Sequence, residues 1–301
     1  MHTYLDCLPC FLKQALEAAR IAGVDEAVQK KLLNKVLKEI TRFPLTASPP
    51  EMGRIIYRLV REISGKDDPF KEIKKRSNQL ALNLYPKLKK RVRNSEDKLL
   101  AAVELAIAGN VIDYGVKNSL DIEKELEEIL GGDFPSANKK IFEFEEFRND
   151  LEGVSSLLYL ADNAGEIVFD KILIEELKEL NKEIVFALRN EPVINDALKE
   201  DAYDCGIDKY ARIVSNGSDA PGTILKFCSD EFLKLYQNAE MVISKGQGNF
   251  EALSTEKGRI YFLFKVKCPV LAKDIGCELG SMVLKKAGFS NGVNCRPTSD
   301  E

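Results

Sequence analysis

The second half of the chain alternates short apolar runs with segments of helical period, and this alternation constrains the fold more than any other feature. The apolar runs have the length of β-strands, which we expect at about residues 156–161, 184–188, 212–215, 240–244 and 259–265. Strands that alternate with helices form βαβ units, in which the strands pair in parallel and the helices cover both faces of the sheet. The sequence therefore predicts an α/β fold with a mostly parallel sheet.

The first half has apolar residues at helical spacing instead. We expect helices at about residues 4–22, 25–42, 51–63, 67–92, 98–108 and 122–130, with Pro86 as a kink in the fourth. No linker rich in glycine, serine or proline separates the two halves, so they are expected to pack together rather than move freely. The predicted architecture is a helical domain, residues 1–150, packed on a three-layer α/β/α domain, residues 151–301.

Histidine is nearly missing from the chain, because His2 is the only one among 301 residues. This argues against a catalytic triad or a zinc site built on imidazole groups. An enzyme of this composition would use carboxylates, lysines or metal-bound water as its acids and bases.

The formal net charge of −4 gives no general attraction for nucleic acid or for an anionic membrane. No apolar stretch approaches the roughly 20 residues that span a bilayer, and residues 1–12 lack the basic start and cleavage site of a signal peptide. The seven cysteines are an odd number, which suits reduced thiols better than a disulfide framework. We therefore expect a cytoplasmic protein.

A polar cluster follows the first predicted strand of the sheet. It comprises Asp162, Asn163, Ala164, Gly165 and Glu166, directly before a segment of helical period. In an open α/β sheet, ligands bind outside the carboxyl ends of the strands, and hard divalent cations take oxygen ligands of this kind. We expect Asp162 and Asn163 to hold a divalent metal, with Gly165 letting the backbone pass close to a ligand.

The next strand ends at a second polar cluster, which includes Asn195 and Asp196. In isolation, this pair is better interpreted as the N-cap of a following helix. Beside Asp162 and Asn163, the preference reverses and Asp196 becomes the expected third metal ligand. Asp219, in the cluster at residues 215–222, is a lower-ranked rival for that place.

A third cluster, residues 244–251, follows the strand expected at 240–244 and contains Lys245, Gly246, Gly248 and Asn249. Backbone N–H groups and an ammonium could cradle a phosphate there. The pattern is neither a Walker A loop nor GxGxxG, and taken alone a plain turn is the better interpretation.

Two motifs in the helical half also carry polar groups. Asn110 and Asp113 follow Gly109 at a spacing that places both on one helical face, although a simple helix C-cap is equally favoured. Cys7 and Cys10 form a CxxC without the second CxxC of a zinc tetrad. They could form a redox pair, but a packed pair away from the chemistry is favoured.

Taken in order along the chain, these motifs resemble the metal-dependent damage-control phosphatases, a family once known only as a domain of unknown function. The resemblance rests on Cys7-x-x-Cys10, Gly65-x-x-Asp68-Pro69-Phe70 with Lys74 and Asn78, Gly109-Asn110 with Asp113, Asp162-Asn163-Ala164-Gly165-Glu166, Asn195-Asp196, and Lys245-Gly246-x-Gly248-Asn249. The early CxxC and the compact length make the chain resemble the branch of this family found in archaea and some bacteria.

The resemblance implies a helical domain on an α/β/α domain, and a divalent metal (Mg, Mn, Co or Ni) bound by Asp162, Asn163 and Asp196. It implies hydrolysis of small phosphomonoesters, such as sugar phosphates or phosphopantetheine derivatives, and we favour metal-activated water over Asp162 as the nucleophile. The expected catalytic residues are Asp162, Lys245 and Asn110. The expected substrate-binding residues are Asn110, Asp113, Glu166, Lys245, Gly246, Gly248 and Asn249.

Two other interpretations stay open. A Rossmann-like nucleotide-binding protein or methyltransferase could use the turn at Asp162 for a ribose or a phosphate without a metal, although GxGxxG is missing from the sequence. A non-enzymatic interaction module would use the polar clusters merely to cap helices. The expected partner is a small phosphorylated metabolite, neither nucleic acid nor membrane, and the sequence leaves the oligomeric state open.

Overall fold

The computed structural model describes residues 1–109 and 139–288. Its centre is a seven-stranded sheet with the order β1-β7-β6-β5-β2-β3-β4. The strands are β1 (Ile141–Phe142), β2 (Ser156–Leu160), β3 (Glu183–Leu188), β4 (Arg212–Ser215), β5 (Val242–Lys245), β6 (Ile260–Lys265) and β7 (Met282–Lys286). All neighbouring strands are parallel except β6 and β7, which are antiparallel.

The chain reverses its direction of travel across the sheet between β2 and β5. From β2 it proceeds outward to β3 and β4, then returns to β5 beside β2 and continues to β6 and β7. This is a topological switch point, where the loops after two neighbouring parallel strands diverge and leave a crevice. The carboxyl ends of β2 and β5 therefore flank the place where a ligand is expected.

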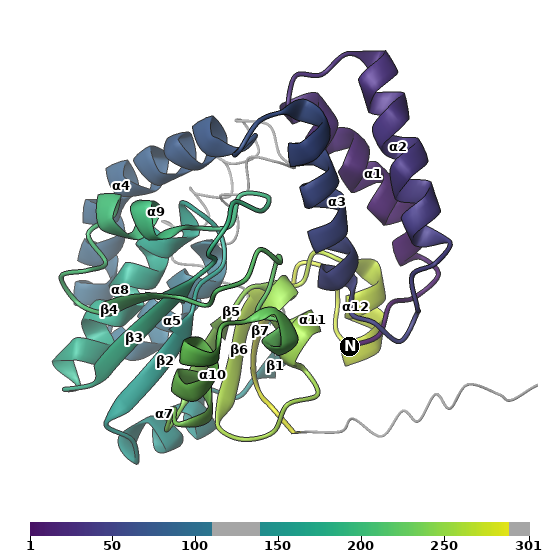
Figure 1. The fold of residues 1–301 in the computed structure, drawn as a ribbon. Helices are drawn as coiled ribbons and strands as arrows, with labels where there is room; N and C mark the ends of the chain where they lie inside the picture. Colours follow the sequence, from purple (N-terminus) through teal and green to yellow (C-terminus); the bar gives the residue numbers. More distant parts are fainter. Residues whose placement is uncertain (110–138, 289–301) are drawn as a thin grey trace, which may run out of the picture.

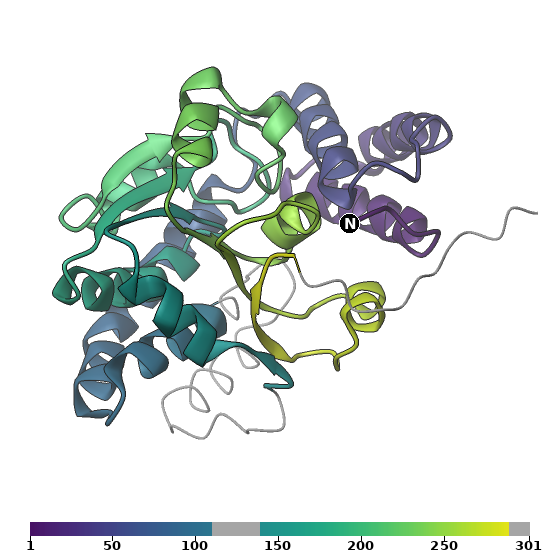
Figure 2. The same cartoon turned by 90° about the horizontal axis from the view of Figure 1, so that it is seen from below.

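Successive side chains of a strand point to opposite faces of the sheet, so alternate residues belong to two separate cores. Leu157 and Tyr159 face one core, whereas Leu158 and Leu160 face the other. The first layer contains α4 (Lys71–Asn94), α5 (Lys98–Ala108), α7 (Phe144–Glu152), α8 (Glu166–Glu179) and α9 (Lys199–Asp204). The second contains α10 (Asp230–Gln237), α11 (Gln247–Leu253) and α12 (Pro269–Ile275). Figure 2 shows helices on both sides of the sheet.

A third core belongs to the helices α1 (Cys7–Ile21), α2 (Glu26–Ile40) and α3 (Pro49–Ser64). These three helices form a group beside the sheet rather than over either of its faces (Figure 1). Their ends carry the expected signals: Asp25 accepts from the N–H of Val28, and α3 begins with proline and ends at Gly65 in the left-handed conformation. We call this group the helical core.

The five predicted strands are present, and the structure adds β1 and β7 at one edge of the sheet. β7 was not predicted because its apolar run is short and ends in Lys285 and Lys286. β1 was not predicted because it has only two residues. α4 continues as one helix through Pro86. The helices α4, α5 and α7, which begin before residue 150, pack on the sheet rather than in the helical core. The domain boundary at residue 150 stays a prediction. The helix expected at 122–130 lies outside the described residues.

Candidate functional site

The turn after β2 presents Asp162 and Asn163 at the switch point. Gly165, with φ of 81°, ends this turn and precedes α8. Its N–H donates to Oδ1 of Asn78 on α4, at 2.6 Å, and the amide of Asn78 donates to Asp201 on α9, at 2.7 Å. Asn78 therefore holds the turn from the side of the helical layer. No function was predicted for Asn78 from the sequence.

The structure brings Asp196 to this turn, as predicted. Asn163 and Asp196 form an isolated antiparallel β-bridge, and the N–H of Ala197 donates to the carbonyl of Asp162 at 2.8 Å. The alternative N-cap function of Asp196 is not seen, because α9 begins at Lys199 with Leu198 as its N-cap. Two carboxylates and one amide thus converge at the carboxyl ends of β2 and β3.

Arg189, the first residue after β3, is the main site residue that the sequence analysis missed. Its guanidinium is buried, donates from Nε to Oδ2 of Asp196 at 2.7 Å, and places Nη2 at 3.8 Å from Oδ1 of Asp162. It also donates to Thr223 and to the amide oxygen of Asn249, both at 3.3 Å. Its position directly at a strand end was the sequence signal that could have identified it.

Burial dominates the electrostatics of this cluster. Burial raises the pKa of Asp162 well above its ordinary value; the carboxylates of Glu166 and Asp196 raise it further, while the positive charges of Arg189 and Lys267 oppose the rise. Burial also raises the pKa of Asp196 to about 6, against the opposing effect of Arg189. Buried negative charge that one guanidinium only partly offsets would be stabilised by a further cation.

The donor set of the cluster consists of oxygen atoms. The amide nitrogen of Asn163 donates to Asp162 at 2.9 Å and to Glu166 at 3.2 Å, so its amide oxygen is the atom that Asn163 can offer to a cation. Within residues 1–109 and 139–288, no three or more His, Cys, Asp or Glu side chains are arranged as a metal site. A metal between Asp162 and Asp196 could take the amide oxygen of Asn163 as a further protein ligand.

Lys245, which was predicted to bind phosphate, lies fully buried beneath the turn. Its ammonium donates to the carbonyl of Ala106 at 2.8 Å, to Glu166 at 2.7 Å and to Asp170. An ammonium has three N–H donors, so all three are engaged within the protein. In this conformation Lys245 links β5 to α8 and α5. Its predicted contact with phosphate would require it to give up one of these three hydrogen bonds.

The glycines after β5 make the close approach of β2 and β5 possible. A Cβ on Gly246, where φ is 83°, would lie 1.9 Å from Oδ2 of Asp162. A Cβ on Gly248 would lie 3.1 Å from the carbonyl of Pro221. The buried amide of Asn249 donates to the carbonyls of Ala161 and Lys245, at 3.1 and 2.7 Å. These residues therefore hold the end of β5 close to the turn that carries Asp162.

The other predicted residues have separate positions. Asp219 accepts from Arg54 and Arg58 on α3, and these guanidinium groups outweigh burial and lower the pKa of its carboxyl. Asn110 and Asp113 lie outside the described residues.

The CxxC lies in the first turn of α1, with Cys7 buried and Cys10 exposed. Partial burial raises the pKa of both thiols, which lowers their thiolate content near neutral pH and makes them poor nucleophiles.

Comparison with known proteins decides the family. The damage-control phosphatase ARMT1-like domain matches residues 3–283 of this chain. The chain belongs to this family. An uncharacterized protein of Methanocaldococcus jannaschii is 37% identical over 294 residues, which cover 93% of this chain and 94% of the relative. A damage-control phosphatase of Pyrococcus horikoshii is 33% identical over 294 residues, which cover 96% of this chain and 99% of the relative.

A solved structure supports the same assignment. The crystal structure of a DUF89 family protein from Pyrococcus horikoshii is similar to this chain with a TM-score of 0.84 and 33% identity, and the match covers 96% of this chain and 100% of that one. The predicted family and fold class are thus confirmed, and the names of the damage-control phosphatase relatives support a phosphatase. In the described part of this family member, no helix is long and apolar enough to cross a membrane.

Proposed function

We propose that this member of the damage-control phosphatase family hydrolyses small phosphomonoesters with the help of a divalent metal. The observation that carries the proposal is the convergence of Asp162 and Asp196 at the switch point, joined through the bridge between Asn163 and Asp196. The substrates that we propose are sugar phosphates or damaged phosphorylated metabolites.

Asp162, Asn163 and Asp196 would hold the metal. Carboxylate and amide oxygens suit Mg, Mn, Co or Ni better than a soft cation, and the raised pKa of Asp162, caused first by burial and then by its acidic neighbours, supports a cation at this point. When bound, a divalent metal neutralises charge on the transferring phosphoryl group and lowers the pKa of coordinated water.

The side chains around these ligands would orient the substrate. Lys267 follows β6, is exposed, and its positive charge already acts on Asp162. It is therefore better placed than the enclosed Lys245 to meet the phosphate of an incoming substrate. The first turn of α11, which begins at Gln247 beside Gly246, brings further N–H donors to this edge of the sheet.

We propose water rather than Asp162 as the nucleophile, since a carboxylate committed to a metal is a weak free nucleophile. Arg189 would orient Asp162 and Asp196 and would oppose the rise that burial causes in the pKa of both carboxyls, because its guanidinium lies close to them. A covalent aspartyl phosphate trapped on Asp162 during turnover would contradict this part of the proposal.

The experiment that tests the proposal is hydrolysis of a generic aryl phosphate by metal-stripped protein. Mn, Co, Ni or Mg is then added, in parallel, to the wild type, to Asp162→Ala and to Asp219→Asn, which is a control for removal of a carboxylate outside the cluster. We expect added metal to restore activity in the wild type and in Asp219→Asn but not in Asp162→Ala. Activity that is independent of metal, or that survives in Asp162→Ala, would overturn the proposal.

A further inference from the structure

The loop that carries Asp196 also reaches into the helical core. Val193 is buried in that core, whose other buried members among the described residues lie between Cys7 and Phe70. Ile194 packs against the same core. Two consecutive residues of the sheet domain are therefore anchored among the side chains of α1–α3 and the segment that follows α3.

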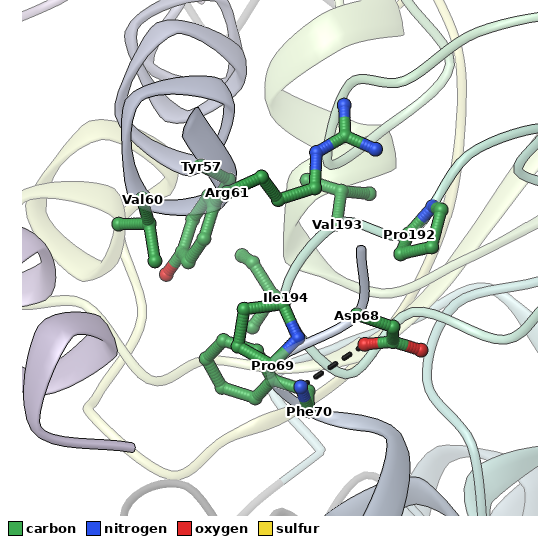
Figure 3. Close-up of a pocket in the computed structure, with 9 residues that line it drawn as sticks. All are labelled: Tyr57, Val60, Arg61, Asp68, Pro69, Phe70, Pro192, Val193 and Ile194. Atoms are coloured by element: carbon green, nitrogen blue, oxygen red, sulfur yellow. Dashed lines mark hydrogen bonds between the residues drawn. The ribbon is translucent and has the colours of Figure 1, made fainter. Parts of the chain in front are cut away.

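The contact between residues 192–194 and the helical core surrounds a small cavity (Figure 3). The cavity is lined by Tyr57, Val60, Arg61, Asp68, Pro69, Phe70, Pro192, Val193 and Ile194. Its volume of about 10 Å³ has room for no more than one water molecule. The feature is thus a packing contact between α3, the start of α4 and the Asp196 loop, rather than a pocket for a ligand.

Ile194 has an unfavourable backbone conformation at this contact. Its φ is 45°, in the left-handed region, where a β-branched side chain is a genuine outlier. The N–H of Asp196 donates to the carbonyl of Val193 at 3.1 Å, which closes a tight turn around Ile194. Such a conformation persists only where surrounding contacts hold it, and here those contacts come from the helical core.

The residues on the other side of Ile194 are fastened to the metal-ligand turn. The N–H of Ala164 donates to the carbonyl of Asn195 at 2.9 Å, and the N–H of Ala197 donates to the carbonyl of Asp162 at 2.8 Å. The backbone at Ile194 therefore lies between an anchor in the helical core and two hydrogen bonds that set Asp196 against Asp162. A change in its φ would rotate the chain directly before Asn195, whose carbonyl accepts from Ala164, and before the proposed ligand Asp196.

We infer that the helical core positions Asp196 by anchoring Ile194. The anchored Ile194 keeps the loop at residues 193–197 in a backbone conformation that would be unfavourable without this contact. Ile194 is a positioning residue: it touches neither the proposed metal nor the substrate, and it acts through the two backbone hydrogen bonds on Ala164 and Ala197. The inference deepens the proposed function and rests on it where it concerns the metal, since Asp196 is one of the ligands proposed there.

Three substitutions at Ile194 separate positioning from stability. Ile194→Gly accepts the positive φ but removes the anchor, Ile194→Ala removes the anchor and keeps the backbone strain, and Ile194→Leu keeps an apolar anchor. Leu32→Ala is the matched control, because Leu32 is buried in the helical core but does not line the cavity. Backbone hydrogen exchange at residues 160–168 and 193–199 measures the local stability of the loop and of the turn that it contacts. Calorimetric titration with Mn²⁺ measures the affinity of the proposed metal site.

In Ile194→Gly and Ile194→Ala, we expect protection of the amides of Ala164 and Ala197 to fall about tenfold or more. Mn²⁺ should bind about 10- to 100-fold more weakly. Ile194→Leu and Leu32→Ala should remain close to the wild type in both measurements, even though Leu32→Ala unfolds at a lower temperature.

Protection in Ile194→Gly equal to that of the wild type would overturn the inference, as would an equal loss in Leu32→Ala. If wild-type protein bound no Mn²⁺, the proposed metal site would fail, while hydrogen exchange would still decide whether the helical core holds the loop.

Discussion

Gly246 and Asp162 meet at the switch point so closely that a Cβ at position 246 would overlap the Asp162 carboxylate. A Cβ there would lie 1.9 Å from Oδ2 and 2.8 Å from Oδ1 of the Asp162 carboxylate. The backbone of Gly246, with φ of 83° and ψ of 158°, also belongs to a region that is essentially restricted to glycine. The end of β5 is thus shaped around the first proposed metal ligand.

Gly246→Ala should therefore damage both stability and the site. Backbone strain and overpacking together should lower the free energy of unfolding by about 2–5 kcal/mol. Gly276→Ala is a control for a positive φ without a close neighbour, and should cost about 1–2 kcal/mol. Denaturant unfolding and Mn²⁺ titration measure the two effects. Equal losses in both variants, with unchanged Mn²⁺ affinity, would show that the approach to Asp162 is unimportant.

Lys245→Met should be strongly destabilising, because it leaves Glu166 and Asp170 as uncompensated buried charges. Removing one partner of a buried ion pair typically costs about 3–5 kcal/mol. The substitution Lys35→Met is the comparison, since Lys35 pairs with Glu62 where their side chains are 37% and 65% exposed, and such a solvent-screened pair contributes little to stability. Thermal unfolding of both variants tests this, and similar losses would contradict the structural function assigned to Lys245.

Asn78→Ala should loosen the turn that presents Asp162 and Asn163. It removes the acceptor of the Gly165 N–H and the donor to Asp201, and a buried polar group left without its partner costs about 1–3 kcal/mol. The neighbouring Gln79 is exposed on the same helix, so Gln79→Ala should change stability by less than about 0.5 kcal/mol. Chemical unfolding with Mn²⁺ titration checks the result; an Asn78→Ala protein indistinguishable from Gln79→Ala would refute it.

Asp219 and Asp196 can be separated as rivals for the third ligand. Asp219 is buried and pairs with Arg54 and with Arg58 on α3, so Asp219→Asn should lower stability but leave Mn²⁺ affinity unchanged. Asp196→Asn should weaken Mn²⁺ binding by more than about tenfold. Calorimetric titration of the two variants decides between them, and the reverse pattern would make Asp219 the ligand.

The buried carboxyl of Asp170 should make stability decrease as the pH rises. Burial, reinforced by Glu166 and opposed by Lys245, raises the pKa of Asp170 from 3.8 to about 7. The folded state therefore holds this proton more tightly than the unfolded chain does, and between these two pKa values the folded state loses stability as pH increases.

Unfolding free energies of metal-free protein at about pH 5 and pH 7 measure this dependence. The decrease between the two pH values should be smaller in Asp170→Asn, which cannot titrate at this position. An identical decrease in the wild type and the variant would assign the dependence to other groups.

Much of the site was predictable because it follows strand ends. The runs before Asp162, Arg189 and Lys245 have strand length, and parallel strands bring their carboxyl ends to the same edge of a sheet. This pattern predicts that Asp162, Asn163 and Asp196 lie together. β7 was missed because nothing in its five residues marks an antiparallel return, which depends on pairing with β6.

By itself, the sequence determined the alternation of strands and helices, the glycine and asparagine turns, and the order of polar clusters along one edge, because these depend on local periodicity and turn chemistry. The tertiary structure alone decided the direction of each side chain. Packing of α5 and α8 directs Lys245 into the core, pairing at the strand ends directs Arg189 between two carboxylates, and the helical core holds Ile194 at a positive φ. These outcomes depend on contacts between residues far apart in the chain, which no local pattern records.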